Sequence, residues 1–198
     1  MSEPTSLDLD AAARAIRRGT LVVYPTETVY GLGADALDPT AVERVFEAKG
    51  RDRSNPISMA VPDVDTAVQY TELSSRERAF MSAFLPGPVT VVVERGGAVP
   101  DELTAGSDRV GVRIPDHEGA LALLDAVAPI TATSANVSGR PSARRVADVD
   151  GRIREQAAVV LDGGETPGGG STVVDVERGE IHRRGRLAVE VEGWLADN

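Results

Sequence analysis

Short apolar runs recur along the chain between stretches with helical patterning. Residues 21–24 are apolar throughout and stop at Pro25, which is typical of a strand buried on both faces. Similar runs predict further strands, at residues 57–61, 89–93, 110–114, 130–133, 159–161 and 172–176. A sheet made of such strands needs covering elements on its faces.

The first helical stretch lies close to the N-terminus. Its apolar positions predict a helix over residues 9–18. Asp8 or Asp10 can cap the start of this helix, because a carboxylate accepts a hydrogen bond from the free backbone N–H groups there. Gly19 can end it in the left-handed conformation that glycine adopts at low cost.

The second helix has stronger end signals. Asp38 is a capping residue, and Pro39 follows it at the first helical position, where its missing N–H costs nothing. The apolar side of this helix continues until Gly50. Helices are also predicted at residues 75–85 and 119–127. Because strands and helices alternate, we expect an α/β fold with a twisted, mostly mixed β-sheet and surrounding helices.

The composition sets limits on the kind of protein. The chain has 198 residues, of which 41% are hydrophobic, so it can form one sizeable core. It has no cysteine and two histidines, which excludes disulfides and cysteine nucleophiles and argues against a multi-histidine metal site. No apolar run reaches the ~18 residues of a membrane span, and residues 1–4 lack a leader pattern. We expect a cytoplasmic protein.

The charge balance is strongly acidic. Aspartate and glutamate number 31 against 21 lysines and arginines, which gives a net charge of −10. This surface is typical of a salt-adapted, halophilic protein, since molar salt screens repulsion beyond ~3 Å. A GC-rich codon bias that favours arginine is the alternative, and it stays open. In either case the charge argues against a protein whose main task is binding nucleic acid.

Lys49 is the only lysine in the chain. It lies at the predicted end of the second helix, and Arg51 follows two residues later. One interpretation is chance in a lysine-poor sequence. The other is an ammonium directed at a phosphate, where a compact lysine charge and a planar arginine fork can bind the same polyphosphate.

The familiar nucleotide and hydrolase motifs are absent. A P-loop needs lysine followed by serine or threonine, but glycine follows Lys49. Residues 31–36 match the loose dinucleotide pattern, although the next helix starts only at Asp38, so we interpret this match as spurious. No Gly-x-Ser-x-Gly elbow occurs.

Three polar clusters remain, at residues 25–32, at 49–55 and at 131–142. Hydroxyl, amide and cationic groups beyond the ends of strands are typical of ligand sites in open α/β sheets. The third cluster can also be a turn that bonds to its own backbone. The glycine-rich segment 163–170 is either a surface connection or a functional element, which would be a lid or a close approach of backbone to a ligand, and both interpretations stay open.

Six ordered motifs resemble those of the YrdC family. They read Pro-Thr-Glu-Thr-Val-Tyr-Gly-Leu, Glu-Ala-Lys-Gly-Arg with Asn-Pro, Pro-Gly-Pro-Val-Thr, Val-Gly-Val-Arg-Ile-Pro, Ser-Ala-Asn-Val-Ser-Gly and Ser-Thr-Val-Val-Asp. The resemblance covers residues 9–184, so we place a YrdC-like domain at residues 7–187 and a short C-terminal segment at 188–198. It implies a twisted mixed sheet with helices around it, in the short single-domain form.

The resemblance also implies an activity. The best-known members of the family are L-threonylcarbamoyladenylate synthases, which join L-threonine, bicarbonate and ATP and release pyrophosphate. Their product serves the threonylcarbamoyladenosine modification of tRNA. For this chain we therefore expect a nucleotidyltransferase that passes its product to a tRNA threonylcarbamoyl-transfer complex and itself binds tRNA weakly. Two alternatives stay open: a non-catalytic RNA- or ribosome-associated protein, and a carbamoyl-transfer domain like that of hydrogenase maturation proteins.

Site residues follow from the resemblance by position. The residues that would bind ATP are Lys49, Arg51, Asn55, Ser134, Asn136, Ser142 and Arg183. Those that would bind L-threonine are Thr28, Arg113 and Ser171. Lys49 and Arg51 would act in catalysis by stabilising charge on the phosphates. Magnesium would be carried by ATP, with no metal cage in the protein.

Three positions depart from the family pattern. Ala60 stands where many synthases have a histidine, which removes a polar contact to the substrate. Arg109 replaces a usual threonine, and we expect it to add a cation close to the bound carboxylate and phosphates. Arg184 replaces a usual proline beside Arg183.

Overall fold

Strand β1 (Leu21–Tyr24) shows how the apolar pattern becomes a sheet. All four side chains are buried. Leu21 and Val23 join one hydrophobic cluster, whereas Val22 and Tyr24 join a second cluster on the opposite face. Because successive strand side chains point to opposite faces, an unbroken apolar run marks a strand covered on both sides.

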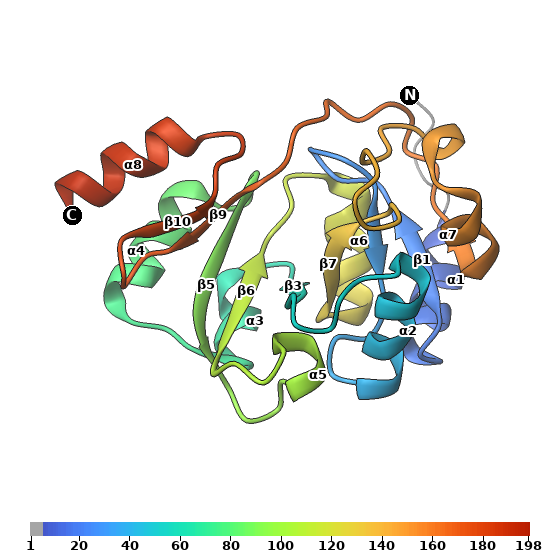
Figure 1. The fold of residues 1–198 in the computed structure, drawn as a ribbon, viewed down its shortest axis with the longest axis horizontal. Coiled ribbons are helices and arrows are strands. Elements are labelled where there is room, and N and C mark those ends of the chain that lie inside the picture. The colour runs from blue at the N-terminus through green and yellow to red at the C-terminus, as the bar shows by residue number, and fades with distance from the viewer. Residues whose placement is uncertain (1–5) are drawn as a thin grey trace.

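The computed structural model describes residues 6–198 (Figure 1). The strands are β1, β2 (Gly31–Gly33), β3 (Ser58–Ala60), β4 (Thr71–Glu72), β5 (Val89–Arg95), β6 (Arg109–Arg113), β7 (Ile130–Ser134), β8 (Ala157–Val160), β9 (Thr172–Asp175) and β10 (Glu180–Arg183). The helices are α1 (Ser6–Arg17), α2 (Pro39–Lys49), α3 (Val64–Val68), α4 (Ser75–Phe84), α5 (Asp101–Thr104), α6 (Glu118–Val127), the 3₁₀ turn η1 (Val146–Asp148), α7 (Gly151–Gln156) and α8 (Ala188–Asp197). The expectation about a leader at residues 1–4 lies outside the described residues.

The strands form one ten-stranded sheet in the order β10-β9-β5-β6-β3-β7-β2-β1-β8, with β4 paired to β5. Three of the pairings are parallel: β1 with β8, β3 with β6, and β5 with β9. The other pairings are antiparallel. The predicted α/β fold with a mixed sheet is therefore confirmed.

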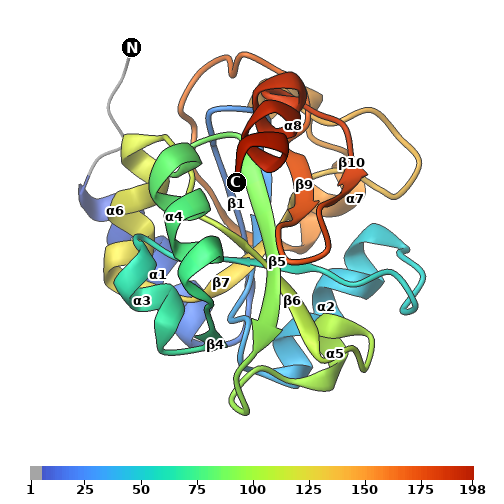
Figure 2. The same cartoon turned by 90° about the vertical axis from the view of Figure 1, so that its left-hand side faces the viewer.

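Helices cover both faces of the sheet, as Figure 1 shows. Helices α1 and α6 contact each other and close the smaller hydrophobic cluster, while α2, α5 and α7 cover the opposite face. At the β10 end, α8 packs on α4 through Trp194, whose ring lies 5.0 Å from that of Phe80 (Figure 2). No helix within residues 6–198 is long and apolar enough to cross a membrane.

The predicted helix ends were partly right. Asp38 caps α2 by accepting a hydrogen bond from the Thr40 N–H at 2.9 Å, and Gly50 ends the helix at a φ of 56°. The expected N-terminal caps of the first helix were wrong, since α1 begins at Ser6 and so contains Asp8 and Asp10 within its length, whereas Gly19 follows its end in the left-handed conformation, as predicted. The C-terminal segment 188–198 forms α8; the domain boundary before it stays a prediction.

The glycines of β2 have a packing reason. A side-chain carbon at Gly31 would lie 2.8 Å from the ring of Tyr24, and one at Gly33 would lie 3.1 Å from it. The ring of Tyr24 therefore occupies the space that side chains at these positions would need. Because Gly31–Gly33 is a strand and opens no helix, the dinucleotide match at residues 31–36 is spurious, as expected.

A buried charge cluster joins three elements beside β5. Arg109 of β6 places Nε 2.9 Å from Asp175 Oδ2 of β9, and its Nη2 lies 3.5 Å from Glu77 Oε1 of α4. Asp175 is fully buried, and Glu77 is 2% exposed. Arg109 also donates to the Val92 carbonyl at 2.7 Å. Arg109 thus pairs with two buried carboxylates, and Nε of the exposed Arg178 also lies 3.7 Å from Asp175 Oδ2.

We predict that Arg109→Met lowers the free energy of unfolding by about 3–5 kcal/mol, because Glu77 then has no cationic partner in the core and Asp175 keeps only its longer contact with the exposed Arg178. The matched control is Arg53→Met, which removes an arginine that is 60% exposed and pairs with Glu43; it should leave the unfolding midpoint almost unchanged. Urea unfolding at fixed salt measures both. Equal midpoints for the two variants would contradict the interpretation.

Candidate active site

A cavity of about 750 Å³ opens where several strand ends meet. Most of the residues expected to bind ligands line it: Thr28, Arg51, Asn55, Arg113, Ser134, Ser142, Ser171 and Arg183. The exceptions are Lys49 and Asn136. The fold therefore brings segments that are far apart in the sequence to one place, although their roles in binding stay predictions.

The turn between β1 and β2 positions Thr28. Its hydroxyl lies 3.0 Å from that of Thr26, and its backbone N–H donates to the Thr26 Oγ1 at 3.2 Å. Arg113 at the end of β6 donates from Nη2 to the Thr28 hydroxyl at 2.7 Å. These contacts fix Thr28 and Arg113 relative to one another before any ligand binds.

The far wall of the cavity comes from β9 and β10. Ser171 precedes β9, and its hydroxyl accepts a hydrogen bond from Arg183 Nη2 at 2.7 Å and lies 3.2 Å from that of Thr90. The pairing of β10 with β9 shifts register between Ile181 and Arg183. A bulge of this kind turns side chains out of strict alternation, which is consistent with both His182 and Arg183 lining the cavity.

Lys49 is 2% exposed and lies behind the cavity wall. Its ammonium donates to the carbonyl oxygens of Ser134 and Asn136, the latter at 2.8 Å. Its own carbonyl accepts from the Ser138 N–H at 2.8 Å. The lone lysine thus fixes the loop that follows β7. An ammonium has three donors, so one N–H remains for a ligand.

The cations around the cavity are crowded and poorly hydrated. Burial, together with the nearby Arg51 charge, lowers the pKa of Lys49 to about 8. Burial also lowers the pKa of Arg51, and burial with the charges of Arg113 and Arg51 lowers the pKa of Arg183. The protein therefore holds these charges close to one another at an energetic cost that an anion would relieve.

Five arginines line the cavity; Arg178 is 62% exposed and lies 3.7 Å from Asp175, and the other four fall into two groups. Arg109 and Arg113 pair with carboxylates: Arg113 Nη2 lies 2.8 Å from Glu27 Oε1, and Arg109 is held in the cluster described above. Arg51 and Arg183, like Lys49, have no carboxylate partner within residues 6–198. Arg109 is thus present as expected, but its charge is already compensated.

The segment between β8 and β9 crosses the top of the molecule (Figure 1). It is fastened at several points: the Gly168 N–H donates to the Thr28 carbonyl at 2.7 Å, and the Tyr30 hydroxyl donates to the Gly164 carbonyl at 2.7 Å. Gly170 at its end lines the cavity. The segment therefore brings backbone close to the ligand space, which was one of the two interpretations left open.

A smaller cavity of about 430 Å³ adjoins the first, and Ser142 lines both. Asn136 lines the smaller one. Its amide nitrogen donates to the carbonyls of Val137 at 2.9 Å and Arg140 at 2.8 Å, while its Oδ1 is buried without a partner. Asn136 thus offers one free acceptor beside the main cavity.

The sequence analysis did not predict several residues that lie at the cavity. Asp175 and His182 line it, and Glu27 pairs with Arg113 behind its wall. Glu27 belongs to the quoted Pro-Thr-Glu-Thr motif, but nothing in that motif indicates its partner 86 residues away. At Ala60 the cavity wall is apolar, so this chain offers no side-chain hydrogen bond there.

Comparison with known proteins agrees with this geometry. The sequence model of a family described as "Telomere recombination" (Sua5/YciO/YrdC) matches residues 14–185. The Pyrococcus abyssi protein named threonylcarbamoyl-AMP synthase is 44% identical over 168 residues, which cover 83% of this chain and 49% of that protein. A Mycobacterium leprae protein named putative threonylcarbamoyl-AMP synthase is 38% identical, covering 90% of this chain and 83% of its own.

A solved structure of a related protein has the same fold. The Pyrococcus abyssi Sua5 structure complexed with L-threonine superposes with a TM-score of 0.89 at 38% identity, covering 98% of this chain and 58% of that one. The chain spans about half the length of the curated Pyrococcus abyssi and Bacillus subtilis relatives that it matches, at 49% and 46%. The match of sequence and fold over almost the whole chain shows that it belongs to the Sua5/YciO/YrdC family.

Proposed function

We propose that this protein is an L-threonylcarbamoyladenylate synthase, a nucleotidyltransferase that forms threonylcarbamoyl-AMP and pyrophosphate from L-threonine, bicarbonate and ATP. The observation that carries the proposal is the set of cations without carboxylate partners, Lys49, Arg51 and Arg183, beside Thr28 and Arg113. A polyanion would relieve the crowding of the first three. The names of the related proteins support the same reaction.

The nucleotide end of the site would bind the phosphates of ATP. Arg51 and Arg183 line the cavity and donate mainly to backbone carbonyls, so both can turn donors toward phosphate oxygens. Lys49 would add its third donor. Ser134, Ser142, Asn55 and Asn136 would offer neutral hydrogen bonds to the rest of the nucleotide.

The amino-acid end would bind L-threonine. Arg113 uses Nη2 for Glu27 and Thr28, so its Nη1 and Nε donors remain, and these would bind the carboxylate. Thr28 and Ser171 line the same cavity, and their hydroxyls would bind the rest of the amino acid. Ligands held in this way meet in a fixed orientation, which is the main source of rate in such a reaction.

The chemistry needs two bond-forming steps. The threonine amine bonds to the carbon of carbon dioxide and gives up a proton, which yields a carbamate; when bicarbonate is the source, a water molecule leaves in the same overall step. A carbamate oxygen then attacks the α-phosphorus of ATP, and pyrophosphate leaves. Lys49, Arg51 and Arg183 would stabilise the charge that develops on the phosphates.

Magnesium would enter with ATP. Asp175 is the carboxylate among the residues that line the cavity, and Arg109 already engages it. The described residues therefore fit a Mg²⁺ ion that is coordinated mainly by phosphate oxygens and water, which is its usual preference. The bound ion would neutralise part of the phosphate charge.

The product is a reactive mixed anhydride, and we propose that it passes to a tRNA threonylcarbamoyl-transfer complex. The acidic surface, with a net charge of −10, supports weak direct binding of tRNA by this chain. A cytoplasmic location and salt adaptation stay predictions.

Turnover tests the proposal directly. We expect pyrophosphate release from ATP only when L-threonine and bicarbonate are both present, measured at low and at high salt because the chain is acidic. Omitting either compound should reduce the rate to background. ATP turnover that ignores threonine would contradict the proposal, as would tight tRNA binding with no turnover at all, which would favour an RNA-associated role.

Two neighbouring arginines provide a matched test of the nucleotide end. Arg183→Gln should weaken ATP binding by about 1.5–3 kcal/mol, which is roughly tenfold to more than a hundredfold, because a charge-assisted contact is lost. Arg184→Gln removes the same charge one residue later, where the side chain is 59% exposed and pairs with Glu192. It should leave ATP binding within about twofold. Calorimetric titration with ATP measures both, and equal effects would argue against the assignment of Arg183.

A further inference from the structure

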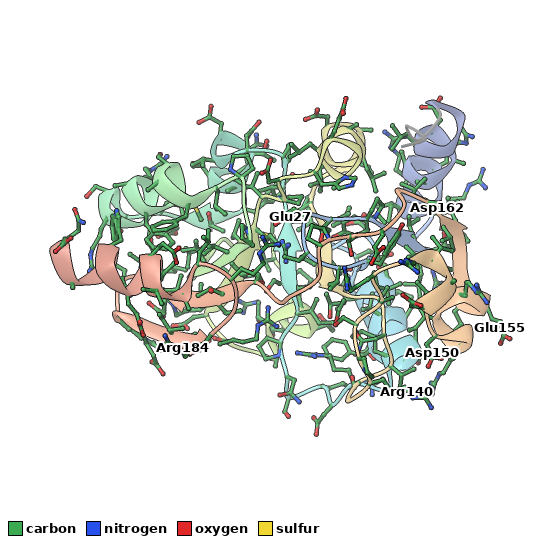
Figure 3. The ribbon with its side chains drawn as sticks, turned by 90° about the horizontal axis from the view of Figure 1, so that it is seen from above. Glu27, Arg140, Asp150, Glu155, Asp162 and Arg184 are labelled. Carbon is green, nitrogen blue, oxygen red and sulfur yellow. The ribbon has the colours of Figure 1, made fainter. Side chains whose placement is uncertain are left out.

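Glu27 lies behind the cavity wall rather than in it. It follows β1 between two threonines, and Figure 3 places it near the middle of the molecule, away from the rim where Arg140 and Asp150 pair. Its side chain is 13% exposed, as is that of Arg113. Glu27 Oε1 accepts from Arg113 Nη2 at 2.8 Å, and Glu27 Oε2 is buried without a partner.

Glu27 compensates one of three neighbouring guanidiniums. The charges of Arg113 and Arg51 both lower the pKa of Arg183, so the three arginines lie within range of one another around one cavity. Of these three, only Arg113 has a carboxylate partner within residues 6–198. Without Glu27, the three would form a continuous cationic surface.

The proposed substrates make opposite demands on such a surface. The phosphates of ATP and pyrophosphate carry several negative charges, whereas threonine carries one carboxylate and one ammonium. A continuous cationic surface attracts polyphosphate to both ends of the cavity and repels the threonine ammonium. Discrimination between the two therefore needs a negative element at the amino-acid end.

We infer that Glu27 is a specificity-determining positioning residue, which neutralises Arg113 so that this guanidinium accepts a single carboxylate and excludes polyphosphate. This role rests on the proposed function. The shared Nη2 contacts with Glu27 and Thr28 also fix the guanidinium plane, which leaves its Nη1 and Nε donors without protein partners among the described residues. Polyphosphate is then confined to the end of the cavity that holds Arg51 and Arg183.

Pyrophosphate binding tests the inference without any turnover. Glu27→Gln keeps the size of the side chain and removes its charge. At an effective dielectric constant near 20, removal of one negative charge from the vicinity of a polyanion is worth about tenfold in affinity or more. We therefore expect Glu27→Gln to bind pyrophosphate about tenfold more tightly than the wild type, by calorimetry at fixed salt and without magnesium.

The matched control is Glu43→Gln, which removes the same charge from an exposed pair with Arg53 on α2. Its pyrophosphate affinity should stay within about twofold of the wild type. Equal affinities of the Glu27 and Glu43 variants would overturn the inference, because a purely structural Glu27 would not alter pyrophosphate binding selectively.

A kinetic measurement gives a second, separate test. In the wild type, pyrophosphate should compete with ATP and not with threonine. In Glu27→Gln it should compete with both, and the KM for threonine should rise about tenfold while that for ATP does not. An unchanged inhibition pattern would overturn the inference, whereas failure of wild-type turnover would overturn the proposed function instead.

The double variant Glu27→Gln with Arg113→Gln covers the case in which the single variant does not fold, since it leaves no unpaired buried charge. If Glu27 neutralises Arg113, removing both should keep pyrophosphate affinity within about twofold of the wild type and abolish threonine binding. A loss of pyrophosphate affinity as large as that of Arg183→Gln would show that Arg113 binds polyphosphate despite Glu27, and would overturn the inference.

Discussion

An imbalance between paired and unpaired cations within one cavity underlies the proposed function. The protein as a whole is acidic, with a net charge of −10, yet the charged residues that line the cavity are mostly arginines. Arg109 and Arg113 are compensated by buried carboxylates, whereas Arg51 and Arg183 are not. An anionic ligand can relieve only the second group, and this difference separates a polyphosphate end from an amino-acid end.

The pairing of the strands in the sheet positions the side chains of the cavity. The parallel pairs β3 with β6 and β5 with β9 bring Ala60, Arg113 and Ser171 to one region, although they are far apart in the sequence. The irregular pairing of β10 adds Arg183 from the edge. Because these side chains come from strands in a shared hydrogen-bonded sheet, their spacing is set by the backbone rather than by flexible loops.

The sequence predicted the elements whose signal is local. Strand β1 and helix α2 carry an apolar pattern and clear end residues, and both were found where expected. Strand β2 was missed because it consists of glycines and one leucine, and its burial depends on the ring of Tyr24. Strand β10 was missed because an exposed edge strand shows no apolar alternation.

The residues of the site were also predictable only where their signal is local. Motifs indicated Lys49 and Arg51, but not that Lys49 lies behind the wall and bonds to the carbonyls of Ser134 and Asn136. The partner of Arg113 was equally hidden, because it is set by folding over a long sequence separation. Local sequence shows which residue types are present, while the pairing of charges appears only when the strands are brought together.

Proton uptake on ATP binding shows whether the cations without carboxylate partners bind the phosphates. Burial and Arg51 lower the pKa of Lys49 to about 8, so near pH 8 a fraction of this lysine is unprotonated in the free protein. A phosphate nearby favours the charged form and raises the pKa, so binding should draw protons from the buffer. Calorimetry without threonine, in two buffers of different ionisation enthalpy, should show an uptake of a fraction of a proton per ATP that disappears in Lys49→Met. Tight ATP binding by the wild type with no proton uptake at pH 8 would contradict the account.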